Sequence, residues 1–583
     1  MAETDDRTPM RNLAGPDALD PLGINKATAD VWQALLGNPQ SMLASQAQLA
    51  SAWMDVATKS LGRLTEAPGK PSAAGSNGTA SSNGGAAPVI EPAPGDNRWK
   101  HPAWRDNPLF DALKQGYLLA TQAVLDGIDR APDVDDATKT RVKFFAKQFC
   151  DAMSPTNFAM LNPAVIEETV KTGGKNLQRG IENAFADARD NGGRPALVDK
   201  TAFTVGVNVA ASAGQVVFRN ELIEVIQYTP TTPKVRARPL VIVPPWINKF
   251  YILDLQPKNS LIKYAVDHGI QTFVVSWRNP DATLGHLGFD DYLDLGPLAA
   301  GRVAREVTNS SSVNQIGYCI GGTLTAMQLA YLAKTDPQIV NAVTFFAAQT
   351  DFTESGELRN FLPPVAAAEP EKKPEAYGVF PASAMADTFN LLRANDLIWN
   401  VAVNRYLLGK DAPAFDLLYW NSDATTMPGA LHEAYLRTMY GENALAGGTS
   451  VLKGVTLDLH DVRNDVYSVA SIEDHIAPWR SVYKMTQLFA GNTRFTLGHS
   501  GHIAGIINAP ASGRGKYWTN AANPRAADAW FSGAQEHAGS WWPDWMAWLT
   551  ERSGDEIDAP QAVGNEKYPA LVPAPGTYVL EKA

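Results

Sequence analysis

Cysteine is scarce in this sequence. Cys150 and Cys319 are the only two among 583 residues, so a framework of several disulfide bonds is excluded and free thiols suit a reducing cytosol. No apolar run is long enough to cross a bilayer, and the acidic start of the chain lacks the apolar segment of a secretory signal. We therefore expect a cytoplasmic protein.

Clusters of basic residues are also missing. The formal net charge is -11, whereas proteins that bind phosphate backbones concentrate lysine and arginine on one surface. His499 and His502 are close enough to share a metal ion, but no cysteine or further histidine stands nearby to complete a site. We expect neither a nucleic-acid partner nor a metal.

The length suggests several structural units. Residues 1–64 predict a partly helical segment, which either packs on a neighbouring unit or adheres as an amphipathic element to a hydrophobic surface. Residues 65–96 are rich in Gly, Ser, Ala, Pro and Asn and predict a flexible linker. Residues 97–200 alternate helical spacing with turn residues and predict a helical N-terminal domain, in which Cys150 is a packing residue.

The period of the pattern changes at about residue 201, where short β-branched runs begin to alternate with helical stretches. This alternation predicts a mostly parallel sheet covered by helices, after an opening hairpin with a turn at Arg219-Asn220. The fold class is thus α/β, with an α/β-hydrolase-type catalytic domain over residues 201–583. The alternation stops between about 351 and 450, which predicts a cap inserted over the site. The predicted strands are 215–228 as a hairpin, 239–243, 271–276, 313–316, 340–346, 465–470 and 494–497.

A nucleophile elbow is predicted at Gly317-Tyr318-Cys319-Ile320-Gly321, between a strand and a helix. Such a turn strains the backbone of its central residue and aims its side chain into a pocket. Cys319 would lie at a helix N-terminus, where the dipole favours a thiolate, and the Ile320 N–H would be free to face an oxyanion.

A thiol nucleophile needs a base, and the base needs an orienting acid. Asp474 and His502 each follow a predicted strand, and the order nucleophile, acid, histidine is that of α/β-hydrolases. His499 is an alternative base, although the small residues around His502 permit closer approach to a sulfur. Asp351 is an alternative acid, and His475 is interpreted as a hydrogen-bonding group beside the site.

The second oxyanion donor is expected in the loop after the 239–243 strand. Pro244 and Pro245 have no N–H, so Trp246 or Ile247 must donate, and we assign Ile247. Attack of a thiolate on a thioester exchanges one thioester for another at little cost in free energy. A cysteine nucleophile therefore favours acyl transfer from a CoA-type donor over hydrolysis.

From about Asp96 to the C-terminus the chain resembles the class I polyhydroxyalkanoate (poly-3-hydroxybutyrate) synthase family. The resemblance rests on five motifs, which are residues 317–322 (GYCIGG), 244–255 (PPWINKFYILDL), 276–280 (SWRNP), 473–479 (EDHIAPW) and 501–505 (GHIAG).

The resemblance implies an acyltransferase that polymerises (R)-3-hydroxyacyl-CoA, with 3-hydroxybutyryl-CoA as a short-chain substrate, and releases CoA. Cys319 would then hold the growing acyl chain, His502 would be the base, and Asp474 would be its partner and help to activate the substrate hydroxyl. Trp420 matches a tryptophan of the cap. With Trp420, we assign Ala504 and His475 to the substrate pocket.

The family further implies that no cofactor acts beyond the CoA of the substrate. It implies a homodimer in the cytoplasm at the surface of polyester granules, and allows granule-associated proteins as partners. A thioesterase or polyester depolymerase on the same fold is the alternative function, distinguished by an acid product. A granule-coating protein with an inactive hydrolase fold is a second alternative, which would not release CoA.

Overall fold

The computed structural model describes residues 24–37, 39–65, 87–362 and 377–583. The chain divides into two compact units. The first, which we call the helical unit, comprises the described residues within 1–197, 360–366 and 393–412, and the second, the sheet unit, comprises the other described residues. No helix within the described ranges has the length and apolarity to cross a membrane.

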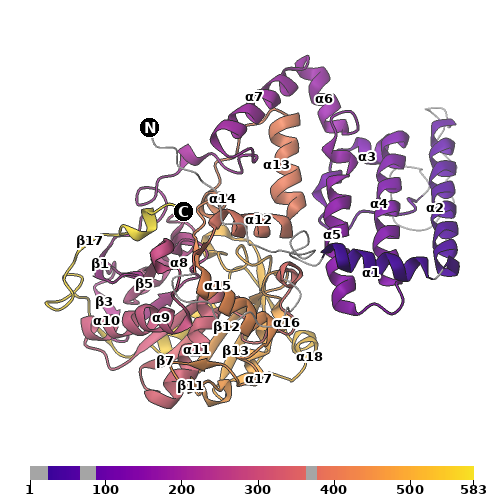
Figure 1. Cartoon of the computed structure of the whole chain (residues 1–583). Helices are drawn as coiled ribbons and strands as arrows, with labels where there is room; N and C mark the ends of the chain where they lie inside the picture. Colours follow the sequence, from indigo (N-terminus) through magenta and orange to yellow (C-terminus); the bar gives the residue numbers. More distant parts are fainter. Residues whose placement is uncertain (1–23, 38, 66–86, 363–376) are drawn as a thin grey trace, which may run out of the picture. The chain divides into compact units, whose positions relative to one another are not determined.

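Among the described residues up to 190, seven α-helices build the helical unit (Figure 1). Asn107 and Asp135 accept hydrogen bonds from backbone N–H groups at the starts of the fourth and fifth helices, which explains where these begin. A small core joins Val31 of the first helix to Ile128 and Val142. The helices are α1 (Ile24–Leu36), α2 (Pro39–Thr65), α3 (Ala103–Asp106), α4 (Pro108–Asp129), α5 (Asp136–Ala152), α6 (Pro163–Thr172) and α7 (Lys175–Asp190).

The predicted linker, 65–96, falls largely on residues 66–86, which lie outside the described residues. Its described end, 87–96, is anchored to the helical unit. The Val89 N–H donates to the Gln115 side chain of α4 at 2.7 Å, and Lys59 of α2 donates to the Ala87 carbonyl at 2.8 Å. Composition alone did not predict these contacts, because they depend on groups far away in the sequence.

The predicted cap region, 351–450, is divided between the two units. Residues 393–412 belong to the helical unit, where Arg405 pairs with the Asp187 carboxylate of α7 and Tyr406 donates to it at 3.0 Å. The remaining described residues of the predicted cap, apart from 360–362, belong to the sheet unit. The ion pair of Arg405 and Asp187 thus holds the middle part of the predicted cap region to α7, and the role of the region as a cap stays a prediction.

The predicted α/β fold is confirmed by a mixed sheet in the sheet unit, with eleven strands in the part of the chain that the structure describes. The six central strands run parallel, in the order β5-β4-β6-β7-β12-β13, and antiparallel strands flank them on both sides. The strands are β1 (Gly214–Arg219), β2 (Ile223–Tyr228), β4 (Leu240–Val243), β5 (Thr272–Trp277), β6 (Val313–Tyr318), β7 (Val340–Phe346), β12 (Asp465–Ser471), β13 (Thr493–Gly498), β14 (Lys516–Thr519), β15 (Gln535–Ala538) and β17 (Val572–Pro573).

The hairpin turn, predicted at Arg219-Asn220, lies one to two residues later than expected. Strand β1 ends at Arg219 and β2 begins at Ile223, so residues 220–222 make the connection. The Asn220 side chain accepts hydrogen bonds from the N–H groups of Leu222 and Ile223, a local geometry that asparagine favours. The edge strands β14, β15 and β17 were not predicted.

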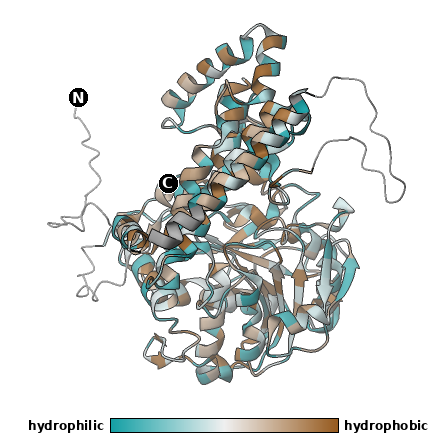
Figure 2. Ribbon diagram, turned by 90° about the vertical axis from the view of Figure 1, so that its right-hand side faces the viewer, coloured by the Kyte–Doolittle hydropathy of each residue, from teal (hydrophilic) through white to brown (hydrophobic). Residues whose placement is uncertain are grey.

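Burial explains the apolar runs of the central strands. Every residue of β4, β5 and β6 is buried, as expected for parallel strands covered on both faces. Hydrophobic colour runs along the central strands, whereas the surrounding helices mix hydrophobic and hydrophilic residues (Figure 2). Helices α8 (Leu261–Asp267), α10 (Ala299–Thr308), α11 (Ile320–Thr335), α16 (Trp479–Tyr483) and α19 (Trp542–Glu551) belong to this unit.

Candidate active site

Cys319 lies at the turn between β6 and α11, in the strained conformation expected of an elbow. Its φ is 53°, in the left-handed region that residues with a side chain seldom adopt. The flanking positions must be glycine, because a side chain at either would collide with neighbouring atoms. A Cβ on Gly317 would lie 2.6 Å from the Gly322 Cα, and a Cβ on Gly322 would lie 2.4 Å from the Ala348 Cβ. Only glycines allow strand and helix to meet this closely.

The backbone holds the elbow and leaves helix donors at its start. The Cys319 N–H donates to the Phe346 carbonyl of β7 at 2.9 Å, which ties the turn to the neighbouring strand. Ile320 is the first residue of α11, and the first N–H groups of a helix have no acceptor within it. The positive end of the helix dipole therefore lies beside the Cys319 sulfur.

Asp474 and His502 meet at the carboxyl ends of two neighbouring parallel strands. Strands β12 and β13 are paired up to Ser471 and Gly498, so the loops that follow them lie side by side. The Asp474 Oδ2 is 2.6 Å from the His502 Nδ1, and both residues are buried. Asp474 Oδ1 accepts the N–H groups of Ile476 and Ala477, each at 2.9 Å, which fixes the orientation of the carboxylate.

The electrostatics of the pair follow from this geometry. Burial by itself lowers the pKa of the His502 imidazole, but the Asp474 carboxylate and a hydrogen bond with Cys319 raise this pKa well above its usual value. Because Nδ1 is engaged with Asp474, the nitrogen left for the sulfur is Nε2. The Tyr318 ring stacks against the His502 ring, with centroids 5.9 Å apart. Cys319, His502 and Asp474 thus form a connected series.

The alternative base, His499, and the alternative acid, Asp351, have other hydrogen-bond partners. His499 is exposed, and its N–H donates to the Lys516 carbonyl of β14. The Asp351 side chain accepts from the N–H of Thr353, and its pKa is lowered despite the opposing effect of burial, through bonds from Thr353 and the charge of Lys484. Among the described residues, neither His499 nor Asp351 makes a hydrogen bond with His502.

The predicted pocket residues take different places. Trp420, in helix α14 (Asp416–Asn421), is buried, and its indole N–H donates to the Lys249 carbonyl at 2.7 Å. His475 is half-buried, next to Asp474, and its carbonyl accepts the Glu357 N–H at 3.3 Å. Ala504 is exposed in the loop after His502.

The loop at 244–250 packs against the elbow. A Cβ on Gly321 would lie 2.5 Å from the carbonyl oxygens of both Val243 and Pro244, so the loop starts in contact with the first turn of α11. Ile247 is 9% exposed, and its carbonyl accepts the Thr425 N–H at 3.1 Å. The indole rings of Trp246 and Trp277 meet edge to face nearby, with their centroids 5.8 Å apart.

Two tyrosines that sequence reasoning missed lie at the site. In the predicted cap region Tyr440 is buried and Tyr435 is half-buried, their hydroxyl oxygens lie 3.5 Å apart, and both interact electrostatically with Cys319. Burial, followed by smaller electrostatic effects, raises the pKa of each, so both remain neutral donors at physiological pH. No sequence motif marks them, because aromatic residues are common throughout this region.

The other thiol, Cys150, belongs to the helical unit. Cys150 is buried in α5, where burial raises its pKa. Among residues 24–37, 39–65, 87–362 and 377–583, no group of three or more Cys, His, Asp or Glu side chains could hold a metal ion.

Two family models match the chain. Residues 95–265 match the model described as "Poly-beta-hydroxybutyrate polymerase (PhaC) N-terminus", and residues 238–509 match the α/β hydrolase fold. The second range contains the elbow and the residues that follow β12 and β13. It therefore agrees with the fold of the sheet unit.

Curated relatives match over nearly the whole chain. The poly(3-hydroxyalkanoate) polymerase of Methylorubrum extorquens is 40% identical over 99% of this chain and 92% of its own length. The poly(3-hydroxyalkanoate) polymerase subunit PhaC of Cupriavidus necator is 42% identical over 84% of this chain and 83% of its own length. The corresponding subunit of Rhizobium meliloti is 38% identical over 96% of this chain and 88% of its own length. The chain therefore belongs to the poly(3-hydroxyalkanoate) polymerase family, whose members are acyltransferase-type enzymes.

Proposed function

We propose that the chain polymerises (R)-3-hydroxyacyl-CoA into polyhydroxyalkanoate with release of CoA, as a class I synthase that prefers short units such as 3-hydroxybutyryl. The observation that supports this most directly is the series from Cys319 through His502 to Asp474, in a chain of this family. A strained cysteine at a helix N-terminus, beside a histidine oriented by a carboxylate, is suited to nucleophilic acyl transfer.

In the first step, His502 Nε2 takes the proton of the Cys319 thiol and the thiolate attacks the thioester carbonyl carbon. The new bond joins the acyl carbon to the Cys319 sulfur. The bond to the CoA sulfur breaks, and the CoA thiolate recovers the proton from His502. Asp474 stabilises the imidazolium between these transfers, because it lies 2.6 Å from Nδ1.

The carbonyl oxygen becomes negatively charged during this attack and needs N–H donors. We assign the Ile320 N–H at the start of α11 as one donor and the Ile247 N–H as the second. Supporting this, the packing of Gly321 against Val243 and Pro244 keeps the loop that carries Ile247 next to the elbow.

In the second step, a 3-hydroxyl group loses its proton to the His502–Asp474 pair, and its oxygen attacks an acyl carbon bound to sulfur. An ester bond forms, the carbon–sulfur bond breaks, and the thiolate returns. Neither step requires a cofactor beyond the CoA of the substrate. Trp420, His475 and Ala504 would line the path of the acyl chain.

We further propose a homodimer in the cytoplasm that works at the surface of its own polyester granules, where granule-associated proteins are further partners. The product is a hydrophobic polymer that separates from water. The helical unit exposes large apolar side chains such as Phe149, Met160 and Phe185, which suit an apolar surface.

The test follows CoA release and product together. The native chain and Cys319→Ala are incubated with (R)-3-hydroxybutyryl-CoA, free CoA is measured with a thiol reagent, and the product is extracted into chloroform. We expect CoA release with soluble polyester from the native chain, and neither from the variant. CoA release with only free hydroxy acid would instead identify a thioesterase.

A further inference from the structure

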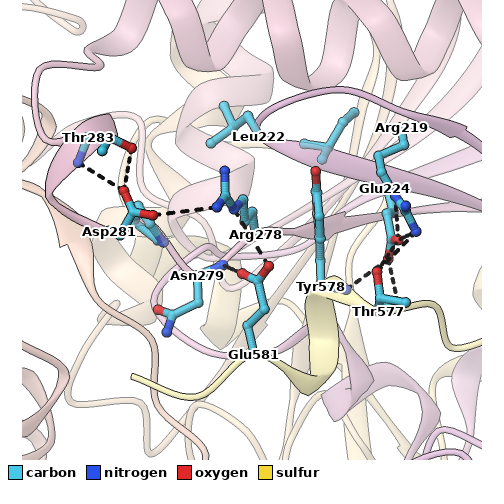
Figure 3. A network of polar contacts seen from close by, with 12 residues as sticks. Arg219, Leu222, Glu224, Arg278, Asn279, Asp281, Thr283, Thr577, Tyr578 and Glu581 are labelled. Carbon is cyan, nitrogen blue, oxygen red and sulfur yellow. Dashed lines mark hydrogen bonds and ion pairs between the residues drawn. The ribbon is translucent and has the colours of Figure 1, made fainter.

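The last residues of the chain bind two segments of the sheet unit that the proposed acylation uses. Glu224, on β2, is fully buried. Its carboxylate accepts the N–H groups of Thr577 and Tyr578, at 2.9 and 3.0 Å, and the Thr577 hydroxyl at 2.9 Å (Figure 3). A buried carboxylate therefore caps the short helix η15 (Tyr578–Leu580).

Other contacts hold the same segment along its length. Tyr578 donates its hydroxyl to the Asn220 carbonyl at 2.6 Å. The guanidinium groups of Arg219 and Arg278 flank its ring on either side (Figure 3). Val579 is 1% exposed and belongs to the main hydrophobic core. Residues 577–582, which we call the C-terminal strap, are thus bound by both polar and apolar contacts.

The strap meets the 244–250 loop at Lys249. This lysine is only 3% exposed, and its ammonium group donates to the Glu581 carbonyl at 2.7 Å. The backbone carbonyl of the same lysine accepts the Trp420 indole N–H. Lys249 therefore joins three segments that are distant in sequence: the loop after β4, helix α14 and the strap.

A second junction lies at Asp423, just after α14, and joins Tyr251, just after the 244–250 loop, to the strap. Its Oδ2 accepts the Tyr251 hydroxyl, and its Oδ1 pairs with Lys582 of the strap, each at 2.9 Å. The chain then continues to Thr425, whose hydroxyl donates to the Trp246 carbonyl at 2.6 Å. The strap is thereby connected to both candidate residues for the second oxyanion donor, since the Thr425 N–H also donates to the Ile247 carbonyl.

A third connection runs through the loop after β5. The Glu581 carboxylate accepts the Asn279 N–H at 3.2 Å (Figure 3), and the Asn279 side chain accepts the N–H and hydroxyl of Thr426. Trp277, at the end of β5, donates its indole N–H to the Pro244 carbonyl at 2.9 Å, where the 244–250 loop begins.

We infer that the C-terminal strap is a positioning element of the acylation site, which fixes the 244–250 loop and the α14 segment relative to Cys319. The inference rests on the proposed acylation of Cys319. Among the described residues, the strap makes no hydrogen bond or ion pair with the thiol or with His502, so it acts only through the loop and α14. Loss of a junction allows the loop to shift without dismantling the sheet.

The test compares Lys249→Met and Glu224→Gln with native protein. Both replacements keep the size of the side chain and remove one end of the strap's anchoring. A rapid-mixing experiment with saturating (R)-3-hydroxybutyryl-CoA measures the rate of CoA release in the first turnover. This rate reports acylation whether the acyl group then goes to polymer or to water. We expect it to fall about 10- to 100-fold in each variant, the size of effect that a misplacement near 1 Å produces.

Two controls separate positioning from loss of structure. The rate at which iodoacetamide alkylates Cys319 reports the elbow itself, and we expect it to change less than about twofold, because the strap does not hold the elbow. Lys567→Met removes an exposed C-terminal lysine that pairs with Glu306 and not with the loop, and we expect native rates in both assays.

Unchanged first-turnover rates in both folded variants would overturn the inference. So would an alkylation rate and a thermal midpoint that change in parallel with acylation, since these indicate a general loss of structure. A native chain that releases no CoA would contradict the proposed function before any variant is compared.

Discussion

Replacing Gly321 by alanine tests how closely the 244–250 loop must approach the elbow. The added Cβ would lie 2.5 Å from the carbonyl oxygens of both Val243 and Pro244. Carbon and carbonyl oxygen atoms normally approach to about 3.3–3.6 Å, so the loop and the first turn of α11 must separate by about 1 Å. The atoms in the way belong to the backbone, which has no rotamer with which to yield.

The magnitude follows from that separation. Gly321 directly follows Ile320, and the facing loop carries Ile247, so the two proposed oxyanion donors move apart. A displacement of about 1 Å at a catalytic centre costs roughly 100-fold in rate. Overpacking of this kind also lowers the free energy of unfolding by about 1–3 kcal/mol.

The assay is the first-turnover release of CoA, measured together with unfolding in urea. Gly301→Ala is the matched control, because Gly301 lies within α10 with no atom within 4 Å of the added Cβ. Alanine there should leave the rate unchanged and stabilise the helix by up to about 1 kcal/mol. A Gly321→Ala variant that acylates at the native rate would refute the assignment of the loop as the second oxyanion donor.

Three further predictions follow from the same geometry. In Asp474→Asn we expect the pKa of His502 to fall, because the carboxylate that raises it is gone, and acylation to slow by about 100-fold or more. NMR titration of His502 measures this pKa. An unshifted pKa in the variant would contradict the assigned cause. Burial lowers the pKa of Lys249 from 10.5 to about 8, with Asp423, Glu581 and Lys582 facing it, so the folded chain binds fewer protons than the unfolded chain between these values. The native chain should therefore gain stability relative to Lys249→Met as the pH rises from about 8 to about 10.5, and urea unfolding at several pH values would show the opposite slope if the sign were wrong. Trp420→Phe leaves the buried Lys249 carbonyl without its donor, so the free energy of unfolding should fall by about 1–3 kcal/mol. Replacing the exposed Trp32 by Phe is the control and should change the free energy of unfolding by less than about 0.5 kcal/mol. Equal effects in the two variants would contradict the importance of the Trp420 hydrogen bond.

The sequence was most informative where a local rule is strict. The glycines around Cys319 predicted the turn between β6 and α11, because a crowded strand-to-helix connection excludes side chains at those positions. Apolar runs located the central strands, since parallel strands covered on both faces must be apolar throughout. The positions of Asp474 and His502 after β12 and β13 followed from the same strand pattern.

Tertiary structure decided what depends on partners far away in the chain. Strands β14 and β15 lie at a sheet edge, where polar residues such as Lys516 and Glu536 pair with each other and no long apolar run forms. Tyr435 and Tyr440 interact electrostatically with Cys319 and belong to a region without a motif.

The C-terminal strap shows the same limit most clearly. Thr577 and Tyr578 have no distinctive spacing, and their role depends on Glu224, more than 350 residues earlier in the chain. A buried carboxylate must find donors, but its sequence neighbours do not reveal which segment will supply them. The sequence by itself therefore determined the fold class and the candidate nucleophile, acid and base. Only the packing of distant segments decided what holds the 244–250 loop in place.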